Sequence, residues 1–414
     1  MGLIATNTVA QGDTREVGLD AMVASGFTIT RAIQSRSWPA ASANLEYAAV
    51  WGTLSEVAAG SRRVADDTPV KAISTLLEAQ GRAEGTPNRL AENSGIAFQG
   101  CIVLGLGFVL EPDEAQEWIA ADPRNADVLF PYLNGEDLNS RADSSASRWV
   151  IDFGTREREE AATYELPFSR VLNQVKPERD KVKIAYRRDF WWRFAAWAPS
   201  LRSAIADLPE VLALARVSKT VMPMRIATDQ VVSDSCVVFA TDDYGDQAVL
   251  SSSLHQLWAI TYASTLETRV RYTPSDVFET FPRPPASDRL ADIGWTLDQE
   301  RREIMQRRDL GLTKLYNMVN DPTVTSDMDI ARMRDIHVEV DQATAGAFGW
   351  TDISLDHGFH VYRQVERWSL SAQARTQVLD RLLLENHART SVARKLPTRG
   401  QSTSVQAAEG TLFD

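Results

Sequence analysis

The strongest candidate for chemistry in this sequence is a basic stretch, VKPERDKVKIAYRRDFWWRF, at residues 175–194. Its cationic side chains are interleaved with acidic ones, and the aromatic residues Phe190, Trp191 and Trp192 lie near its end. Interleaved basic and aromatic side chains suit contacts to a phosphate backbone, with stacking or packing beside it. A solvated helix face that ends in a core-anchoring tryptophan pair explains the pattern equally well.

Two shorter segments, ARVSKTVMP at 215–223 and TRVRYTPS at 268–275, carry a related signal. Each mixes arginine or lysine with a hydroxyl side chain in an expected β-like backbone. Arginine presents a fork of donors that fits phosphates and base edges, so such segments are typical of elements that read a DNA groove. Charged residues at strand ends are common on any protein, so neither segment is diagnostic alone.

The familiar catalytic and metal-binding motifs are absent from the sequence. None of the seven lysines has Asp or Glu two positions earlier, which excludes the common lysine-containing nuclease motif. GxSxG, HExxH, GxxxxGK[ST] and CxxC are also missing. His357 and His360 lack further ligands at a suitable spacing, so we expect surface histidines in a turn and no metal site. The glycines of LGLGF at 104–108 are expected to mark close backbone packing rather than a nucleotide loop.

Composition limits the classes to which the chain can belong. It has 414 residues, 44% hydrophobic and 24% charged, which suits a globular protein of two or three domains. No apolar run reaches the roughly 18 residues that span a bilayer, and no signal peptide is recognised. Cys101 and Cys236 lie in apolar runs, which predicts packed thiols in a reducing cytoplasm. The net charge of −12 argues against indiscriminate coating of nucleic acid, but leaves room for a local basic face.

The first 55 residues alternate strands and helices. A short apolar run at 3–5 precedes polar residues, which predicts a buried strand that delivers polar side chains to a site at its carboxyl end. Residues 56–97 are polar and interrupted by glycine and proline, which predicts a connector with one helix. The expected ranges are a helix at 14–23, strands at 27–33 and 45–54, and the connector's helix near 70–80.

Two further regions and a tail complete the expected organisation. Residues 98–285 mix strands with charged helices and end at a double proline. Residues 286–395 show helical periodicity, with Ser326 and Ser371 as expected helix caps. Residues 396–414 are expected to be a flexible polar tail. The predicted fold class is therefore mixed α/β, with both helices and strands in the core.

Several blocks of the sequence also resemble a known family. GLIATNTVAQGDTREVGLD, ITRAIQSRSWP and ANLEYAAVW come first. FQGCIVLGLGF, DPRNADVLFPYLNGEDLNSR, SRWVIDF, KPERDK, ARVSKTVMP, LSSSLHQLWAITYAS and YTPSDVFETFPRP follow, and then RDLGLTKLYNMVNDP. In this order they resemble, respectively, the end of the methyltransferase domain, the target recognition domain and the C-terminal region of large amino-methylating DNA methyltransferases. The nearest kin are the MmeI-like, or type IIL, restriction–modification enzymes and related phage-defence methyltransferases.

The resemblance implies both an architecture and an activity. It implies a partial Rossmann-like methyltransferase sheet at 1–55, a connector at 56–97, a mixed α/β target recognition domain at 98–285 and a helical C-terminal region at 286–395. The intact enzyme would transfer a methyl group from S-adenosyl-L-methionine to adenine N6 within a specific sequence of double-stranded DNA. In that family the cofactor loop and an Asn-Pro-Pro-aromatic motif lie upstream of the ATN strand, and the 414 residues contain neither. Because that motif holds the flipped base, we expect this chain alone to be inactive and to bind no cofactor.

The resemblance gives this chain the reading of the DNA sequence, and the basic segments at 175–194, 215–223 and 268–275 supply the expected DNA contacts. By resemblance, one polar set would lie at the rim of the catalytic cleft without an assigned catalytic role: Thr6, Asn7, Gln11 and Asp13. The expected phosphate contacts are Lys181, Lys183, Arg187 and Arg188. The expected readers of base edges are Arg216, Lys219, Arg269 or Arg271.

Other interpretations stay open. The chain could be a truncated product, one half of a split methyltransferase, or a non-enzymatic DNA-specificity subunit whose helices dock on a separately encoded methyltransferase subunit. An unrelated globular assembly protein is a third possibility. The tail ends in EGTLFD, a little like peptides that bind the bacterial sliding clamp, although Glu409 stands where they favour glutamine. A disordered tail without a partner is the alternative.

Overall fold

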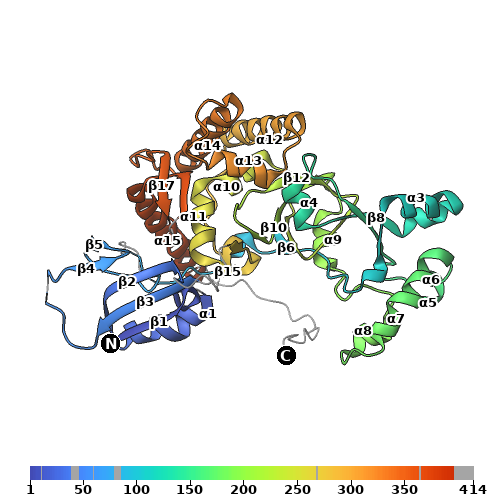
Figure 1. The fold of residues 1–414 in the computed structure, drawn as a ribbon, viewed down its shortest axis with the longest axis horizontal. Coiled ribbons are helices and arrows are strands. Elements are labelled where there is room, and N and C mark those ends of the chain that lie inside the picture. The colour runs from blue at the N-terminus through green and yellow to red at the C-terminus, as the bar shows by residue number, and fades with distance from the viewer. Residues whose placement is uncertain are drawn as a thin grey trace.

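The computed structural model of the chain is a mixed α/β fold with three visible parts (Figure 1). A sheet of the first residues lies at one side, a long arrangement of helices lies above the centre, and a second group of strands and helices extends to the other side. No helix in the part described is long and apolar enough to cross a membrane. The structure describes residues 1–10, 12–38, 46–58, 60–78, 85–266, 269–362 and 365–395.

The N-terminal sheet has five strands in the order β1-β3-β2-β4-β5. Strand β3 lies between β1 and β2 and runs antiparallel to both. Leu19, Phe27 and Val50 belong to a small core of its own, on which the short helices pack. The strands are β1 (Gly2–Thr6), β2 (Thr28–Ser37), β3 (Glu46–Thr53), β4 (Arg63–Ala65) and β5 (Thr68–Val70), and the helical turns are η1 (Asn7–Ala10), α1 (Gly12–Arg15), η2 (Glu16–Asp20) and α2 (Ala21–Ala24).

Two expectations for this region were wrong. The strand at 3–5 was expected to be buried, but among the described residues β1 pairs with β3 alone, and Ile4 is 61% exposed. A strand needs neighbours on both sides and cover on both faces to be buried, and the described residues supply these on one side only. The helix predicted near 70–80 is also absent from residues 71–78, which form turns after the β4–β5 hairpin; residues 79 and 80 lie outside the part described.

The middle of the chain forms three further sheets. One four-stranded sheet has the order β12-β10-β14-β6, and its two inner strands β10 and β14 are buried on both faces. A second sheet has the order β13-β8-β9-β7, and a third the order β11-β16-β15. The strands are β6 (Ala97–Gln99), β7 (Val109–Leu110), β8 (Leu129–Leu133), β9 (Arg148–Ile151), β10 (Glu210–Ala215), β11 (Val217–Ser218), β12 (Met224–Ala227), β13 (Val231–Val232), β14 (Cys236–Phe239), β15 (Ser264–Leu266) and β16 (Arg269–Arg271).

The helices of this middle part cover the sheets and extend beyond them. Trp191 and Trp192 are only 6% and 5% exposed, so the aromatic end of the basic stretch anchors a core and does not stack on a ligand. The LGLGF glycines mark close packing, as expected: a Cβ on Gly107 would lie 2.6 Å from Cβ of Gln174. The helices are η3 (Ala91–Asn93), η4 (Leu106–Phe108), α3 (Pro112–Ala121), η5 (Pro123–Asp127), α4 (Gly135–Ser140), α5 (Arg158–Ala161), α6 (Glu165–Gln174), α7 (Lys176–Arg179), α8 (Ala185–Asp189), α9 (Pro199–Ile205), α10 (Tyr244–Ser251), α11 (Ser253–Tyr262) and η6 (Pro274–Phe278).

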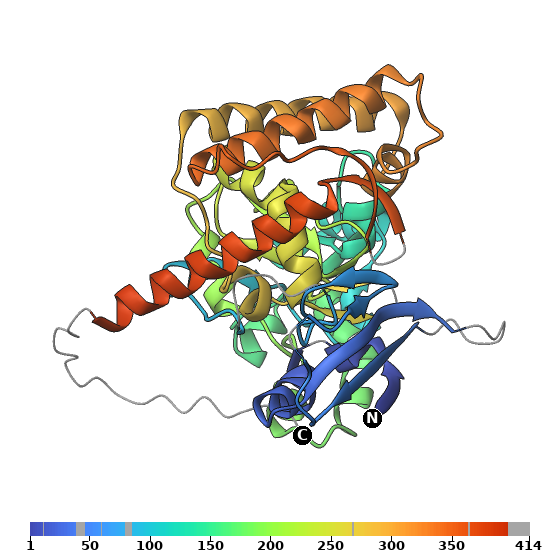
Figure 2. The ribbon, with the colours of Figure 1, turned by 90° about the vertical axis from the view of Figure 1, so that its left-hand side faces the viewer.

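The C-terminal helices share one continuous hydrophobic core with the sheet of β10, β12 and β14. Helix α12 packs on α10 and α14, and α15 contacts α11, across which it runs in Figure 2. An unpredicted hairpin, β17 and β18, interrupts the helices. The elements are α12 (Asp288–Arg308), α13 (Leu312–Val319), α14 (Met328–Ala347), β17 (Gly358–Tyr362), β18 (Val365–Ser369) and α15 (Ala372–Lys395).

Of the two helix caps predicted in this region, one is confirmed and the other is wrong. Ser371 accepts a hydrogen bond from the backbone N–H of Ala374, so it caps α15 as expected. The predicted cap Ser326 is wrong by one residue, because Asp327 accepts from the N–H groups of Asp329 and Ile330. His357 was expected at the surface, but it lies against Asp341, with Nε2 2.8 Å from Oδ2 and 8% of its side chain exposed. The tail at 396–414, with its clamp-like end, lies outside the described residues.

Candidate functional site

The two short basic segments singled out in the sequence are neighbours in the structure. Strand β11 pairs antiparallel with β16, so that Val217 lies opposite Arg271 and Ser218 opposite Val270. The N–H of Tyr272 then donates a hydrogen bond of 2.7 Å to the carbonyl of Arg216. Residues about fifty positions apart in the chain are therefore joined at the end of β10.

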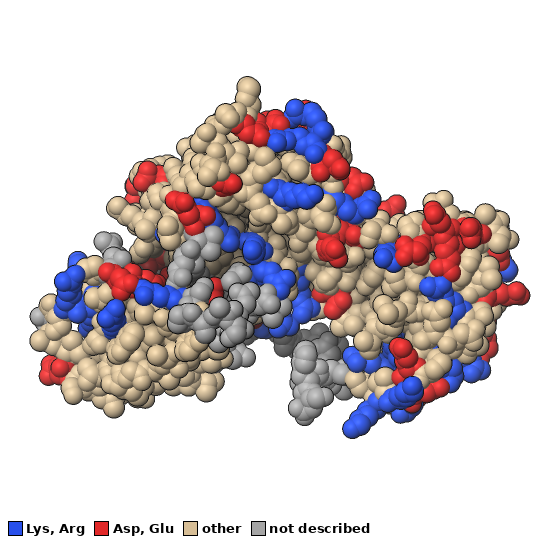
Figure 3. Space-filling view, viewed as in Figure 1, with Lys and Arg blue, Asp and Glu red and all other residues tan. Residues whose placement is uncertain are grey.

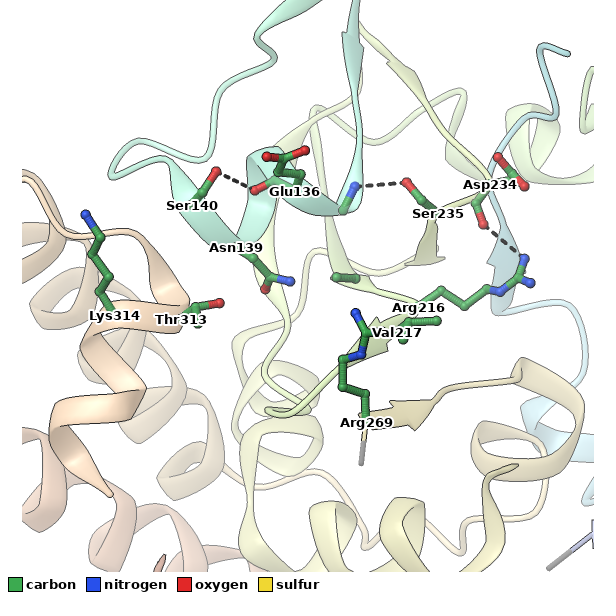
Figure 4. Close-up of a pocket in the computed structure, with 12 residues that line it drawn as sticks. Glu136, Asn139, Ser140, Arg216, Val217, Asp234, Ser235, Arg269, Thr313 and Lys314 are labelled. Atoms are coloured by element: carbon green, nitrogen blue, oxygen red, sulfur yellow. Dashed lines mark hydrogen bonds between the residues drawn. The ribbon is translucent and has the colours of Figure 1, made fainter. Parts of the chain in front are cut away.

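A hollow of about 680 Å³ lies beside this strand pair. Five pieces of chain form its walls: α4, the end of β10 with β11, the turn before β14, β16 and the first turn of α13 (Figure 4). In Figure 4, Asn139 and Arg269 reach toward the same space from different walls. The lining residues that carry polar side chains are Glu136, Asn139, Ser140, Arg216, Asp234, Ser235, Arg269, Thr313 and Lys314.

Local sequence explains how α4 comes to form one wall. Asn134 caps the helix, and its side chain accepts hydrogen bonds from the N–H groups of Glu136 and Asp137, at 2.8 and 3.1 Å. Gly135 lies against the turn before β14: its N–H donates to Oγ of Ser235 at 2.9 Å, and a Cβ would lie 2.9 Å from the Ser235 carbonyl. The Asn134-Gly135 pair is thus the start of a helix that packs against the site.

The guanidinium of Arg216 is held in place by backbone. Its Nη1 donates to the carbonyl of Asp234 at 3.1 Å, and its own N–H donates to the carbonyl of Ser235 at 2.8 Å. Within the described ranges no carboxylate forms an ion pair with Arg216. A guanidinium oriented by a carbonyl keeps its positive charge and several donor hydrogens for a ligand.

Three other lining residues have polar groups without a described partner. In the part of the chain that the structure describes, no hydrogen bond or ion pair is formed by the side chains of Glu136, Asn139 or Lys314. Most described arginines, by contrast, contact a carboxylate or a carbonyl. The sequence did not single these three residues out. Glu136 and Asn139 lie three positions apart on α4, which was a usable signal once a helix was recognised there.

A buried histidine supports the strand pair from the interior. The Nδ1 of His255 lies 2.8 Å from the Leu250 carbonyl, so it carries the proton, and Nε2 accepts from the Tyr272 hydroxyl at 2.9 Å. Complete burial lowers the pKa of His255 to about 4 and raises that of Tyr272. Both groups are therefore neutral near pH 7, and the residue whose N–H fixes Arg216 is itself held by the core.

The residues expected to contact phosphates lie elsewhere. Lys181 and Lys183 are exposed between α7 and α8, and Arg188 on α8 is exposed and pairs with Asp189 at 3.1 Å. Arg187 is half-buried. Figure 1 places α7 and α8 at the far end of the molecule from α13, and Figure 3 shows basic and acidic side chains mixed at that end. These four residues form a separate basic region and do not join the hollow.

The remaining candidates divide between the site and other parts of the molecule. Arg269 lines the hollow, whereas Lys219 and Arg271 are exposed on the same segments and do not line it. Thr6 is exposed at the end of β1 and bonds to Thr8. Asn7 donates to Oε2 of Glu46 at 2.9 Å, which ties the ends of β1 and β3 together. Gln11 and the side chain of Asp13 lie outside what is described.

The described residues contain no group of three or more His, Cys, Asp or Glu side chains that could hold a metal ion. The two cysteines are buried, unpaired thiols, as expected, and burial raises the pKa of Cys236 to about 12. The site is therefore one of hydrogen-bond donors and acceptors around a hollow. That chemistry suits recognition of a polar, partly anionic ligand.

Comparison with known proteins gives the site a context. The sequence model of the MmeI target recognition domain matches residues 92–285, which include β10, β11, β16 and α4. The chain is also similar in fold to a solved type IIL restriction–modification enzyme, MmeI, in complex with DNA. That similarity has a TM-score of 0.70 at 16% identity, and it covers 94% of this chain and 50% of the MmeI chain.

A second solved structure gives a much weaker match. The type IIG restriction endonuclease BpuSI matches with a TM-score of 0.29 at 11% identity, over 83% of this chain and 47% of its own. No curated protein matches the sequence. The chain thus spans about half the length of the solved enzymes that it matches.

Proposed function

We propose, from the premise that residues 92–285 are a target recognition domain of the MmeI family, that this chain reads a specific sequence of double-stranded DNA. The reading serves a site-specific, S-adenosyl-L-methionine-dependent DNA (adenine-N6) methyltransferase of a restriction–modification or phage-defence system in the cytoplasm. The observation that carries the proposal is the joining of segments 215–223 and 268–275 beside one hollow.

The side chains around the hollow match the groups on base edges. Arg216 and Arg269 can donate to the O6 and N7 acceptors of guanine, Asn139 can pair with adenine N6 and N7, and Glu136 can accept from cytosine N4. A site with both donors and acceptors can distinguish base pairs in the major groove. Lys314 carries a charge suited to a phosphate beside the groove.

The basic region at α7 and α8 has a different part in the proposal. Lys181, Lys183, Arg187 and Arg188 would contact phosphates and set the orientation of the duplex without reading its sequence. A local cluster is needed because the whole chain carries a net charge of −12, which repels DNA elsewhere on the surface.

We assign the catalytic part of the activity to residues other than these 414. The order β1-β3-β2, with β3 antiparallel to both neighbours, is compatible with one end of a methyltransferase sheet. The residues at the end of β1 do not fit a cofactor site of their own, because the Asn7 amide bonds to Glu46 and Ser35. This chain would present the DNA, and other residues would supply the Asn-Pro-Pro motif and the cofactor site.

A second candidate is a non-enzymatic specificity subunit that acts with a separately encoded methyltransferase half. The unpaired edge of β1 favours it, since Ile4 is 61% exposed on a strand with one described neighbour. Such an edge can accept a further strand from another part of the enzyme. Co-purification with a chain that carries the missing motifs, together with methylation by the pair only, is the outcome this candidate predicts.

The first experiment is DNA binding by the purified chain. Fluorescence anisotropy on a pool of random-site duplexes, over a series of salt concentrations, would be followed by recovery and sequencing of the bound molecules. An enriched motif is the expected result. Weak, salt-sensitive binding without any motif would contradict the proposal that this chain reads bases by itself.

A further inference from the structure

We propose that three arginines of the C-terminal part, Arg301, Arg302 and Arg367, hold residues 216–225 in the shape needed for sequence reading. Residues 216–225 form the reading segment. The inference rests on the proposed function, because it concerns how the same site keeps its geometry. The inference assigns the C-terminal helices and hairpin a positioning role in sequence specificity, which their sequence did not predict.

The evidence is a set of three hydrogen bonds to backbone carbonyls. Arg367 Nη1 donates to the carbonyl of Lys219 at 2.9 Å. Arg301 Nη2 and Arg302 Nη2 donate to the carbonyls of Pro223 and Arg225, at 2.8 and 2.7 Å. Two of the donors lie next to each other on α12 and the third lies on β18, so two separate elements grip one short stretch of chain.

The reading segment needs such support because its middle has no regular structure. Strand β11 ends at Ser218 and β12 begins at Met224, and the residues between them belong to no helix or strand. Lys219 is exposed in this gap, while the side chains of Val221 and Met222 are buried in the core shared with the C-terminal helices. Backbone carbonyls outside a ladder must find other donors to stay fixed. Arg367 and Arg301 supply them to Lys219 and Pro223, and Arg302 binds the Arg225 carbonyl where the segment enters the edge strand β12.

The surroundings of the arginines fit a structural hold and not contact with DNA. Arg301 is completely buried. Arg302 is oriented by Asp298, whose Oδ2 lies 2.9 Å from Nε, and only 26% of its side chain is exposed. Arg367 is half-buried, and burial lowers its pKa. Within the described ranges, the Lys219 carbonyl is the hydrogen-bond acceptor of the Arg367 side chain.

Arg367 is the residue to change, because replacement of the buried Arg301 would threaten the fold itself. Arg367→Met keeps the apolar stem and removes the donors, and Arg367→Lys keeps one donor that can still reach a carbonyl. Arg381→Met is the matched control: Arg381 pairs with the exposed Asp352, and no described contact joins it to the reading segment.

Two measurements on the full chain test the proposal. Hydrogen–deuterium exchange without DNA reports on the hold: amides of residues 217–224 should exchange at least tenfold faster in R367M, with little change in R367K or R381M. Anisotropy on the duplex selected by the wild-type chain and on a scrambled duplex reports on reading: the ratio of the two affinities should fall about tenfold in R367M, and the affinity for scrambled DNA should be unchanged.

The outcomes separate this inference from the proposed function. Exchange that is unchanged in R367M overturns the inference, and so does faster exchange with full discrimination retained. Equal loss of affinity for both duplexes, with a smaller salt slope, overturns it as well, because it would make Arg367 a phosphate contact. If the wild-type chain shows no sequence preference while exchange responds as expected, the proposed function fails and the hold on residues 216–225 remains.

Discussion

The backbone N–H of Tyr272 donates to the carbonyl of Arg216 at 2.7 Å, while the Tyr272 hydroxyl donates to Nε2 of the buried His255 at 2.9 Å. One residue thus connects the strand pair beside the hollow to the interior of the protein. The position of Arg216 depends in this way on the packing of α11, and changes in the core should be felt at the site.

Replacing Arg216 or Arg269 by alanine should relax the sequence preference at one position of the DNA site. A bidentate arginine–guanine contact contributes about 1–3 kcal/mol of discrimination. Selection and sequencing of bound duplexes would show the affected position. If every position keeps its preference, the arginine concerned is not a reader of bases; Arg381→Ala serves as a control distant from the reading segment in its described contacts.

Replacing Lys181 or Lys183 by alanine should act on all sequences alike. Both side chains are exposed, and a phosphate contact contributes affinity through counterion release. We expect weaker binding of selected and scrambled duplexes by the same factor, and a decrease of about one in the slope of log affinity against log salt. An unaltered slope would mark the lysine as a bystander.

Asn139→Ala should lower discrimination at one position by about 1–3 kcal/mol and leave stability almost unchanged. The Asn139 amide has no hydrogen-bond partner within the described residues, so its removal costs the fold little. Asn125→Ala is the matched control, because Asn125 is buried and donates to the Trp118 carbonyl at 2.8 Å. The control should lower the melting temperature and keep the preference; the reverse pattern would argue against a reading role for Asn139.

Stability should fall as the pH drops from about 6.5 toward 4. Complete burial lowers the pKa of His255 and of His337 to about 4 each, so the unfolded chain binds these protons first. Stability from the two neutral histidines is fully present above their unfolded pKa of about 6.5 and is lost below it, by roughly 3 kcal/mol for each in the limit of low pH. Urea unfolding at several pH values measures this, and His255→Gln should flatten the dependence. A profile identical to that of the wild type would refute the assignment.

Gly294→Ala should destabilise the protein strongly. A Cβ at Gly294 would lie 1.8 Å from the Tyr244 carbonyl, where α12 packs on α10, so the helices would have to separate. We expect a loss of several kcal/mol, at or above the usual cost of about 1–3 kcal/mol for overpacking.

Gly346 on α14 is exposed, and only the end of Arg289 lies within 4.0 Å of its Cβ position. Gly346→Ala should therefore raise the melting temperature slightly, by helix propensity.

The parts predicted correctly from the sequence are those with a local cause. The strand expected at 45–54 is present as β3 at 46–53, and Ser371 caps α15 as its capping chemistry predicted. The failures concern long-range relationships. Burial of β1 depends on strands that pair with its second edge, and Trp191 and Trp192 were ambiguous because core packing and base stacking use the same side chains.

The site shows the same division between local and long-range information. Arg216 and Arg269 were proposed from residue type, but nothing in the sequence indicated that β11 and β16 pair and bring them to one hollow. Lys314 and Arg367 come from the C-terminal region, which gave a helical pattern without a functional signal. Only tertiary structure places a lysine of α13 and an arginine of β18 beside segments about a hundred residues or more away.

Arg301, Arg302 and Arg367 bind residues 216–225 through backbone carbonyls and not through side chains. Every amino acid has a backbone carbonyl. The hydrogen bonds to residues 219, 223 and 225 therefore do not depend on which side chains these residues carry. Mutations that change the exposed side chains of the reading segment can then alter the preferred DNA sequence without loosening the backbone that presents them. Under the proposed function, a single substitution of an exposed side chain would change the preferred DNA sequence while the backbone of residues 216–225 keeps its position.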